Sequence, residues 1–216
     1  EHRIFEQCEA IEAELPPLLQ GYFMYLKNNL LPLSRLAYLR DTRFFCTYLI
    51  HETACKEDAA TIRELKPEHF DCLTSMDVNL FIDYCRRYKI ETEKNIYVYE
   101  NDKSSLARKK SSVSVLFKYL YRDQLIGRNI TDGFDPIRLP KAGEREIKAL
   151  QDDEVMRMLD AVESGEGLTK SERNYWKKTK YRDKLILLLL VTYGLRLSEL
   201  QQLNLSSFNF DRGEFK

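Results

Sequence analysis

Residues 181–214 read YRDKLILLLLVTYGLRLSELQQLNLSSFNFDRGE, and this stretch decides the fold of the C-terminal part of the chain. Seven consecutive apolar residues, Leu185–Val191, leave no polar stripe, so a helix here is expected to be covered on every side by a core. Gly194 can adopt the left-handed conformation that ends a helix, and Leu197–Leu200 resumes helical spacing. We therefore predict that Arg196 is held rigidly and desolvated at a corner between two helices, where a guanidinium suits the binding of an oxyanion.

The same corner resembles the first-arginine motif of the tyrosine recombinases, the phage-integrase and Xer family, which is written TGLRxSEL. Here Thr192–Leu200 reads TYGLRLSEL, with a tyrosine inserted or substituted before the glycine. The resemblance implies that Arg196 stabilises the charge on a phosphate in the transition state and that Glu199 supports it. Two alternatives are purely structural: Arg196 is buried and pairs with Glu199, or Glu199 is an acid favoured near a helix N-terminus.

The resemblance extends upstream to about Leu15. Residues 104–141 resemble the last helix and exit linker of the family's core-binding domain, except that Asn129–Thr131 stands where the family has Asn-Pro. Leu150–Glu154 resembles the opening of the catalytic domain. The implied fold is mainly α: a four-helix SAM-like core-binding domain, then the helical first part of an α+β catalytic domain that ends in a short β-hairpin.

Prolines, Gly143 and mixed charges interrupt the periodic pattern over residues 135–148, which predicts a domain boundary there. We expect a DNA-clamping domain over residues 1–137, a linker over 138–148 and the start of the catalytic domain over 149–216. The resemblance implies that the remaining catalytic residues, the nucleophilic tyrosine included, would follow Lys216. The chain by itself is therefore expected to grip DNA without cleaving it.

Capping residues and apolar periodicity predict the individual elements. We expect a first helix from Pro16–Pro17 through Leu26 and a second from Pro32 to about His51, with Ser34 as its N-cap. Further helices are expected after Thr74 or Ser75, over Ser105–Gln124 and from Leu150. Ile96–Tyr99 is expected to form a short strand in a polar loop.

The helix over residues 105–124 has two faces at 100° per residue. We expect the apolar face to contain Leu106, Val113, Leu116, Phe117, Leu120 and Tyr121, and the outer face Arg108, Ser111, Ser112, Val115, Lys118 and Arg122. Charge alone favours an ordinary solvated outer face, whereas the family resemblance favours contact with DNA phosphates or base edges. The candidate DNA-binding residues are Arg108, Lys109, Lys110, Ser111, Ser112, Lys118, Arg122, Lys141, Lys177, Lys178 and Lys180.

The chain is formally neutral, with 34 basic and 34 acidic residues, but its charges are segregated. Residues 103–122 hold six bases and no acid, and residues 170–184 hold seven bases and two acids. Such segregation predicts a basic surface that attracts a polyanion. Within the second segment, Trp176 is expected either to rest on a DNA backbone or to pin a surface loop.

Composition excludes several other classes of protein. No apolar run reaches the roughly 18 residues of a membrane span, and residues 1–14 do not resemble a secretory signal. The odd number of cysteines, five, argues against a closed disulfide framework and favours reduced cytosolic thiols. His51 and Cys55 have a spacing that could face one metal, but no second pair accompanies them, so we expect neither a metal nor a cofactor.

The resemblance implies a site-specific recombinase that cuts and rejoins double-stranded DNA through a 3′-phosphotyrosine intermediate. It further implies a monomer in free solution, a tetramer on DNA and a cytoplasmic, nucleoid-associated protein. Two alternatives remain: a non-enzymatic helical DNA-binding or regulatory module derived from the family, and a plain helical scaffold with no affinity for duplex DNA.

Overall fold

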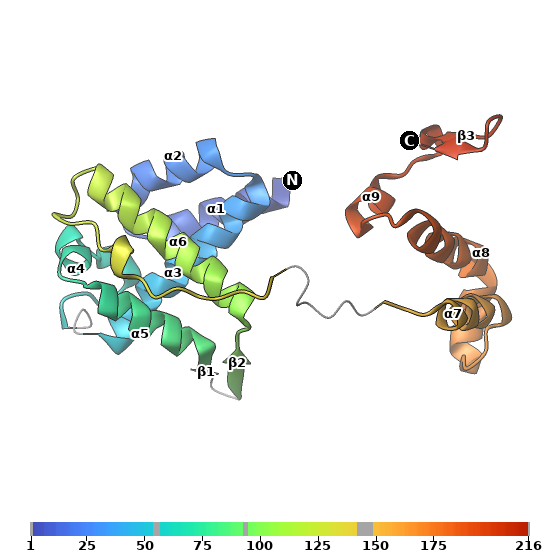
Figure 1. The fold of residues 1–216 in the computed structure, drawn as a ribbon, viewed down its shortest axis with the longest axis horizontal. Helices are drawn as coiled ribbons and strands as arrows, with labels where there is room; N and C mark the ends of the chain where they lie inside the picture. Colours follow the sequence, from blue (N-terminus) through green and yellow to red (C-terminus); the bar gives the residue numbers. More distant parts are fainter. Residues whose placement is uncertain (1, 54–56, 93–94, 142–148, 216) are drawn as a thin grey trace. The chain divides into compact units, whose positions relative to one another are not determined.

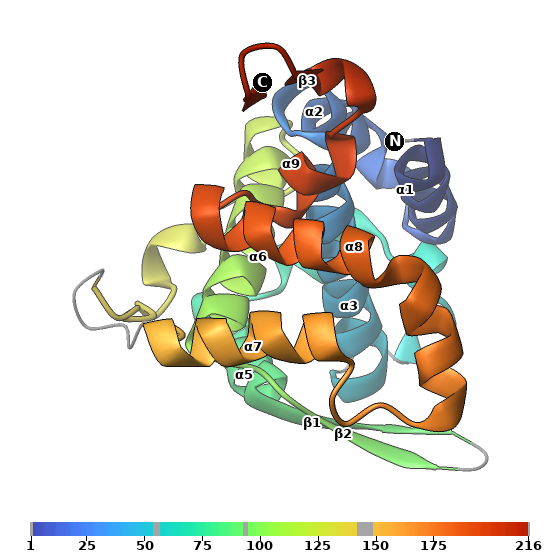
Figure 2. The same ribbon diagram turned by 90° about the vertical axis from the view of Figure 1, so that its right-hand side faces the viewer.

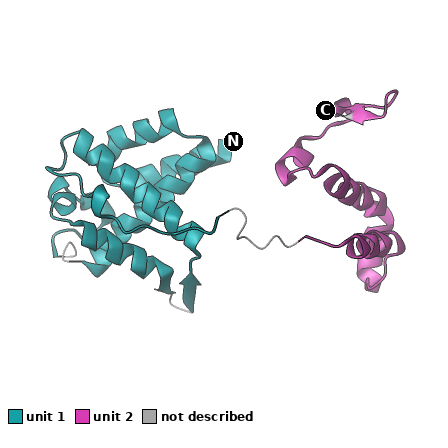
Figure 3. Ribbon diagram, in the orientation of Figure 1, with its two compact units in different colours: residues 1–144 teal, residues 145–216 magenta. Residues whose placement is uncertain are grey.

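The computed structural model describes residues 2–53, 57–92, 95–141 and 149–215. The chain divides into two compact units, Glu1–Glu144 and Arg145–Lys216, shown in teal and magenta in Figure 3. Most of the predicted linker, residues 142–148, lies outside the described residues.

Unit 1 is a helical bundle with one small hairpin (Figures 1 and 2). Its longer helices are α1 (His2–Glu14), α2 (Gln20–Asn29), α3 (Pro32–Glu52), α5 (Ser75–Arg86) and α6 (Lys103–Arg122), with a short α4 (Pro67–Asp71). Strands β1 (Arg87–Glu91) and β2 (Ile96–Glu100) pair antiparallel, with Tyr88 opposite Tyr99. The strand predicted at Ile96–Tyr99 is therefore present, and its partner β1 was missed.

The predicted helix starts are mostly confirmed. Thr74 caps α5, and its N–H donates to the Asp77 carboxylate at 2.7 Å. Asp102 caps α6 by accepting a hydrogen bond from Ser105 N at 2.7 Å. The prediction for α3 was wrong about the cap: Leu31 is the N-cap and Ser34 lies inside the helix, because Pro32 already supplies the first helical residue.

The core of unit 1 forms where α3, α5 and α6 pack together, and α1 and α2 cover a further side. In α6, the predicted apolar face is buried except for Tyr121, which is 47% exposed. Tyr119 is buried instead, because its ring packs against Tyr22 and Tyr25 at centroid distances of 5.5 and 6.0 Å. The assignment of Tyr121 to the core was therefore wrong.

Unit 2 contains three helices and a short hairpin among its described residues (Figure 1). The elements are α7 (Asp152–Ser164), α8 (Lys170–Tyr193), α9 (Leu197–Gln202), β3 (Phe208–Asn209) and β4 (Glu214–Phe215). The predicted mainly α fold with a terminal hairpin is confirmed. The basic segment before the apolar run is the first half of α8, which Thr169 caps, so Trp176 lies in a helix.

The apolar run in α8 is not covered on every side, so that prediction was wrong for the described residues. Leu185, Leu188 and Val191 are 51%, 38% and 46% exposed, and Leu189 is the buried apolar residue of the helix. Within the described part of unit 2, α7 and α9 are the helices that pack on α8, and they leave much of its surface open. In the parts of the chain that the structure describes, no helix combines the length and apolar character needed to cross a bilayer.

Candidate functional site

The corner at Arg196 forms as predicted. Gly194 takes the left-handed conformation (φ 61°, ψ 31°), and its N–H donates to Leu190 O at 3.0 Å, which ends α8. Arg196 is the N-cap of α9 and has extended backbone angles. The chain thus turns within three residues, Gly194–Arg196, from one helix to the next, with Arg196 at the start of the second.

The side chain of Arg196 is exposed rather than desolvated. Its exposed fraction is 83%, and its Nη1 donates to Glu199 Oε1 at 2.9 Å. Glu199 Oε2 accepts a second hydrogen bond, from the Arg196 backbone N–H at 2.8 Å. These bonds, the backbone one first, lower the pKa of Glu199. The prediction of a buried arginine was wrong for unit 2 taken by itself, because α9 is short and the described residues of unit 2 leave the Arg196 side chain 83% exposed.

Glu199 therefore holds both the backbone and the guanidinium of Arg196. A guanidinium has five N–H donors, and the contact with Glu199 uses one of them. The remaining donors of Arg196 can reach an oxyanion from solvent. The pairing that the structural alternative requires is present, whereas the burial that it requires is absent.

Two of the candidate cations on α6 bind a buried carboxylate. Asp41 of α3 is 3% exposed, and it accepts hydrogen bonds from Arg108 Nη1 and from Lys109 Nζ, the latter at 3.3 Å. Burial raises the pKa of Asp41, and the positive charges of Lys109 and Arg108 oppose that shift. Lys109 itself is only 11% exposed in its side chain. It neutralises the carboxylate in the core and is not accessible to DNA.

Ser112 is also inside the protein, so its predicted place on the outer face was wrong. The residue is fully buried, and its Oγ donates to Tyr38 O at 3.2 Å, where α6 packs on α3. A small hydroxyl at this position lets the two helices approach closely. Ser111, one residue earlier, is exposed and donates to Ala107 O at 2.9 Å.

Lys110 fastens the segment that leaves unit 1. Its Nζ donates to Asp135 O at 2.5 Å and to Phe134 O at 3.3 Å. Asn79 of α5 holds the same segment, accepting from Asp135 N at 3.0 Å and donating to Gly133 O at 3.3 Å. Three side-chain groups on two helices thus fix residues 133–135.

The other candidates in unit 1 lie at the surface. Lys118 and Lys141 are exposed. Arg122 is 58% exposed, and its guanidinium lies over the rings of Tyr25 and Tyr119 at 5.1 and 4.9 Å. Arg108 keeps 43% of its side chain exposed despite its contact with Asp41.

The first half of α8 presents a basic stripe. At 100° per residue, five bases fall within an arc of about 80°, and the two acids of the segment, Glu172 and Asp183, lie outside it. The basic stripe consists of Lys170, Arg173, Lys177, Lys180 and Lys184, whereas Lys178 and Arg182 lie outside it, about 120° and 160° from its centre. Lys180 lies 5.0 Å over the Trp176 ring, and Lys184 pairs with Glu163 of α7.

Trp176 pins α8 to α7 rather than facing outward from a loop. Its Nε1 donates to Val162 O at 2.7 Å. Gly165 ends α7 with φ 68°, and a Cβ there would lie 3.0 Å from the tryptophan ring. Of the two expectations for Trp176, the structure favours the pinning role, and it fixes the basic stripe to α7.

No group of three or more potential metal-binding residues occurs among the described residues. Cys55, and with it the His51–Cys55 pair, lies outside the described residues. The described cysteines are Cys8, Cys46, Cys72 and Cys85, and none of them is bonded to another of the four.

Comparison with curated proteins shows which proteins the chain resembles. A segment of 110 residues, 51% of the chain, is 37% identical to the tyrosine recombinase XerC of Alcanivorax borkumensis. Over 223 aligned positions that include 95% of the chain, the identity to the tyrosine recombinase XerS of Streptococcus uberis is 26%. The chain is similar to tyrosine recombinases of the Xer type.

A third tyrosine recombinase, XerS of Streptococcus thermophilus, is 27% identical over 191 residues and 81% of the chain. The chain spans 32% of the length of the Alcanivorax protein and 61% and 52% of the two streptococcal ones. No family model and no solved structure matches it. Because one similarity includes 95% of the chain, it runs through both units.

Proposed function

We propose that the chain is part of a site-specific recombinase that cuts and rejoins double-stranded DNA through a 3′-phosphotyrosine intermediate. In this proposal it supplies the DNA grip and one catalytic residue, Arg196. The observation that carries the proposal is the corner between α8 and α9. There Glu199 holds the exposed guanidinium of Arg196, in a chain that is similar to tyrosine recombinases.

The chemistry follows from the charge that develops on phosphorus. A tyrosine hydroxyl attacks the phosphodiester, a bond forms between phosphorus and the tyrosine oxygen, and the 5′-oxygen leaves and takes a proton. Negative charge grows on the non-bridging oxygens, and the free N–H donors of Arg196 suit them. Glu199 acts as a positioning residue, because its two hydrogen bonds restrict the rotamers of Arg196. Neither metal nor cofactor is needed for these steps.

For the DNA grip we propose two surfaces. The first is the basic stripe of α8, together with Lys178. The second is the exposed part of α6 and the segment after it, which contains Arg108, Ser111, Lys118, Arg122 and Lys141. Lys109 and Ser112 are left out because they are buried, and Lys110 because it binds the backbone of residues 134–135.

Salt-dependent binding tests the DNA grip. The double variant Arg173→Glu/Lys177→Glu should weaken binding to duplex DNA in fluorescence anisotropy. It should also lower the slope of log affinity against log salt by about 2, because each phosphate contact contributes about 0.9. The control Arg3→Glu/Lys27→Glu makes the same change in charge on α1 and α2, at residues that belong to neither proposed surface. Equal slopes for the two double variants would exclude the basic stripe as a DNA contact.

Covalent trapping tests the reaction itself. The protein translated from the whole reading frame should form a covalent complex with a nicked half-site substrate, and Arg196→Ala should reduce its yield at least about 100-fold. Glu199→Gln should reduce it less. The alternative, a DNA-binding or regulatory module without strand transfer, predicts salt-dependent binding with no covalent complex from any variant.

We also propose that the protein is a monomer when free, assembles as a tetramer on DNA and acts at the nucleoid in the cytoplasm. Sedimentation velocity with and without a duplex carrying two half-sites tests the assembly. A DNA complex that never exceeds two protomers would overturn the tetramer.

A further inference from the structure

Arg108 on α6 is an exposed arginine that a buried acid holds. Its side chain is 43% exposed, whereas the side chain of Asp41 on α3 is 3% exposed. No other ion pair within the described part of the chain joins a buried carboxylate to an exposed arginine. Asp41 lies where α6 packs on α3, so its carboxylate cannot follow a guanidinium that moves in solvent.

The carboxylate of Asp41 is itself held from both of its oxygens. Its Oδ1 accepts a hydrogen bond from Lys109 Nζ at 3.3 Å, and its Oδ2 accepts one from Arg108 Nη1. Arg108 Nη1 also donates to Ala37 O at 3.5 Å. The cluster thus combines one negative and two positive charges at neutral pH. Lys109 neutralises the carboxylate, so the remaining positive charge belongs to the exposed guanidinium of Arg108.

The contacts of Arg108 leave one edge of its guanidinium free. Both hydrogen bonds that it makes to described residues involve Nη1. The other edge, which consists of Nε–H and Nη2–H, presents two parallel donors. Two parallel donors are what O6 and N7 of a guanine accept in the major groove of DNA.

The side chains beside Arg108 on α6 are short, which favours a close approach to DNA. At 100° per residue, Ser104 and Ser111 fall within about 60° of Arg108, and both are exposed. Arg108 therefore extends beyond its neighbours. Lys118 and Arg122 are exposed further along the same face, and α6 contains no acid that would repel a phosphate.

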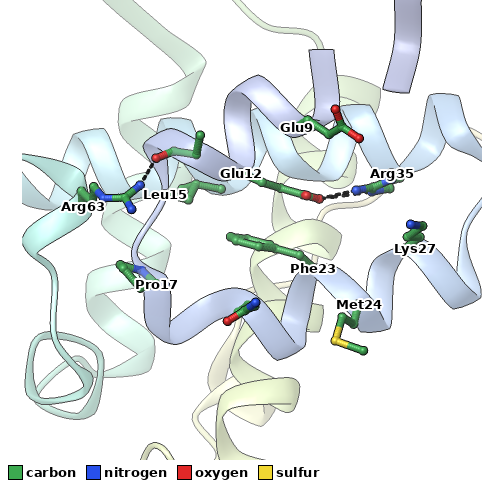
Figure 4. Close-up of a pocket in the computed structure, with 11 residues that line it drawn as sticks. Glu9, Glu12, Leu15, Pro17, Phe23, Met24, Lys27, Arg35 and Arg63 are labelled. Atoms are coloured by element: carbon green, nitrogen blue, oxygen red, sulfur yellow. Dashed lines mark hydrogen bonds and ion pairs between the residues drawn. The ribbon is translucent and has the colours of Figure 1, made fainter. Parts of the chain in front are cut away.

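Arg35 offers a contrast within the same unit (Figure 4). It lies beside the hollow between α1 and α2, and its side chain is 6% exposed. Its Nε and Nη2 both donate to Glu12 Oε1, at 3.2 and 2.6 Å. The edge that Arg108 leaves free is therefore occupied in Arg35, which serves the contact between α1 and α3.

Arg43 is a second contrast, because it is exposed but is held by an acid in solvent. Its side chain is 39% exposed, and that of its partner Glu14 is 51% exposed. The donor is again Nη1, at 3.1 Å from Glu14 Oε2. An ion pair between two exposed side chains restricts an arginine only weakly. Arg43 thus matches Arg108 in exposure and donor atom, and differs in the burial of its partner.

We propose that Asp41 positions Arg108 to read a guanine in the DNA site. This inference rests on the proposed DNA grip and adds a base-specific contact to it. An arginine that is already fixed loses less conformational entropy when it binds. Its two free donors then meet one base edge in a defined geometry, so that it distinguishes bases instead of binding any phosphate.

Selection from random DNA tests the base contact. The library consists of duplexes with about 20 random base pairs, roughly two helical turns. Sequencing of the DNA that the wild type retains should show guanine preferred at least about fivefold at one or more positions. Arg108→Ala should abolish this preference at one position and keep the others. The matched control Arg43→Ala should keep them all, and an unchanged set of preferences in Arg108→Ala would overturn the inference.

The double variant Asp41→Asn/Lys109→Met tests the positioning by Asp41. It removes one negative and one positive charge, so the affinity for the unselected library should stay within about twofold. The guanine preference assigned to Arg108 should fall at least about twofold, because a neutral amide holds a guanidinium less tightly than a carboxylate does. Glu14→Gln, beside Arg43, is the control and should leave every preference intact. A folded double variant with the wild-type preference would refute the role of Asp41.

The mobility of the guanidinium tests the positioning in the wild type, without a variant that could fail to fold. In ¹⁵N relaxation measurements, the order parameter of Nε–H should be higher for Arg108 than for Arg43. The two alanine variants assign the two signals. Equal order parameters would show that Asp41 does not fix Arg108, and the inference would fail.

Failure of the inference can be distinguished from failure of the proposed DNA grip. If the wild type binds no duplex of the library, the DNA grip fails and this inference fails with it. If the wild type binds duplex DNA but prefers no guanine, or prefers only guanines that do not depend on Arg108, this inference alone fails.

Discussion

Helices α6 and α8 are both long, and each combines basic residues with an apolar face or run, yet their apolar residues end up in different environments. Eight of the 20 residues of α6 are buried. In α8, which has 24 residues and the longer apolar run, Leu189 is the buried one. The comparison teaches that an apolar sequence is enough to make a helix, whereas burial depends on which other elements are present to cover it.

The neighbours of the two helices explain the difference. In unit 1, α6 packs against α3 and α5, and Phe117 meets Phe45 and Phe134 edge-on. In unit 2, Leu185 and Leu188 line a hollow of about 390 Å³ beside Phe210. Phe210 is itself 76% exposed. Apolar surface of this kind favours association, so unit 2 is the part of the molecule that gains most from being covered.

The largest expected effect separates the two helices directly. Phe117→Ala should lower the free energy of unfolding by about 3–5 kcal/mol, because it leaves a cavity in a packed core. Leu188→Ala should cost less than about 1 kcal/mol, since the side chain is 38% exposed. Urea unfolding followed by circular dichroism measures both. Similar costs for the two variants would mean that α8 is covered in solution.

The next prediction concerns the buried charge in unit 1. Lys109→Met should cost about 3 kcal/mol at neutral pH, because Asp41 loses a compensating charge in a buried site. The double variant with Asp41→Asn should recover most of this loss, since no charge is then left in the buried site and Arg108, which loses its carboxylate, is 43% exposed. Lys118→Met, on the exposed side of α6, is the control and should change stability by less than about 0.5 kcal/mol.

The pH dependence of this effect has a defined sign. Burial raises the pKa of Asp41 above its usual 3.8, so its contribution to stability is full below that value and is lost as pH rises through the folded pKa. Lys109→Met raises the pKa of Asp41 in the folded protein further, so the stability lost as the pH rises becomes larger. The cost of the variant should therefore shrink as the carboxyl is protonated, and a cost that is independent of pH would contradict the role given to Lys109.

A smaller effect is expected at the contact that fastens α8 to α7. Gly165→Ala should destabilise unit 2 by about 2 kcal/mol, because it adds left-handed strain and a contact of 3.0 Å with Trp176. Gly167→Ala has a similar φ, 78°, but open space around it, so it should cost about 1 kcal/mol. Trp176 is the single tryptophan, so its fluorescence during urea unfolding reports unit 2. If Gly165→Ala and Gly167→Ala lower the free energy of unfolding equally, the tryptophan ring moves aside freely.

The smallest effect is expected where the chain leaves unit 1. Lys110→Met removes the hydrogen bonds to Phe134 O and Asp135 O, which should make local opening about fivefold more frequent for a loss of about 1 kcal/mol. Trypsin cleavage after Arg138 should accelerate by the same factor, with Lys118→Met as the control. An unchanged cleavage rate would leave Asn79 as the residue that holds this segment.

Much of the local structure could be predicted from the sequence. Pro32, Thr74 and Gly194 each act through their own backbone or the next few residues, so their positions in the chain suffice to place helix ends. The corner at Arg196 is of this kind. The hairpin partner β1 was missed because its residues, RYKIE, continue directly from α5 without a turn signal.

What the sequence by itself determined is therefore the set of helices, their ends and the family motif, since these depend on neighbours within a few residues. Only the tertiary structure decided which of those residues are inside: Ser112 and Lys109 are buried, whereas Arg196 and Leu188 are exposed. The periodicity of a helix gives the direction of each side chain from the axis, but not which element lies in that direction. Burial depends on contacts between residues that are far apart in the chain. Which charged side chains remain accessible at a site depends on the same contacts.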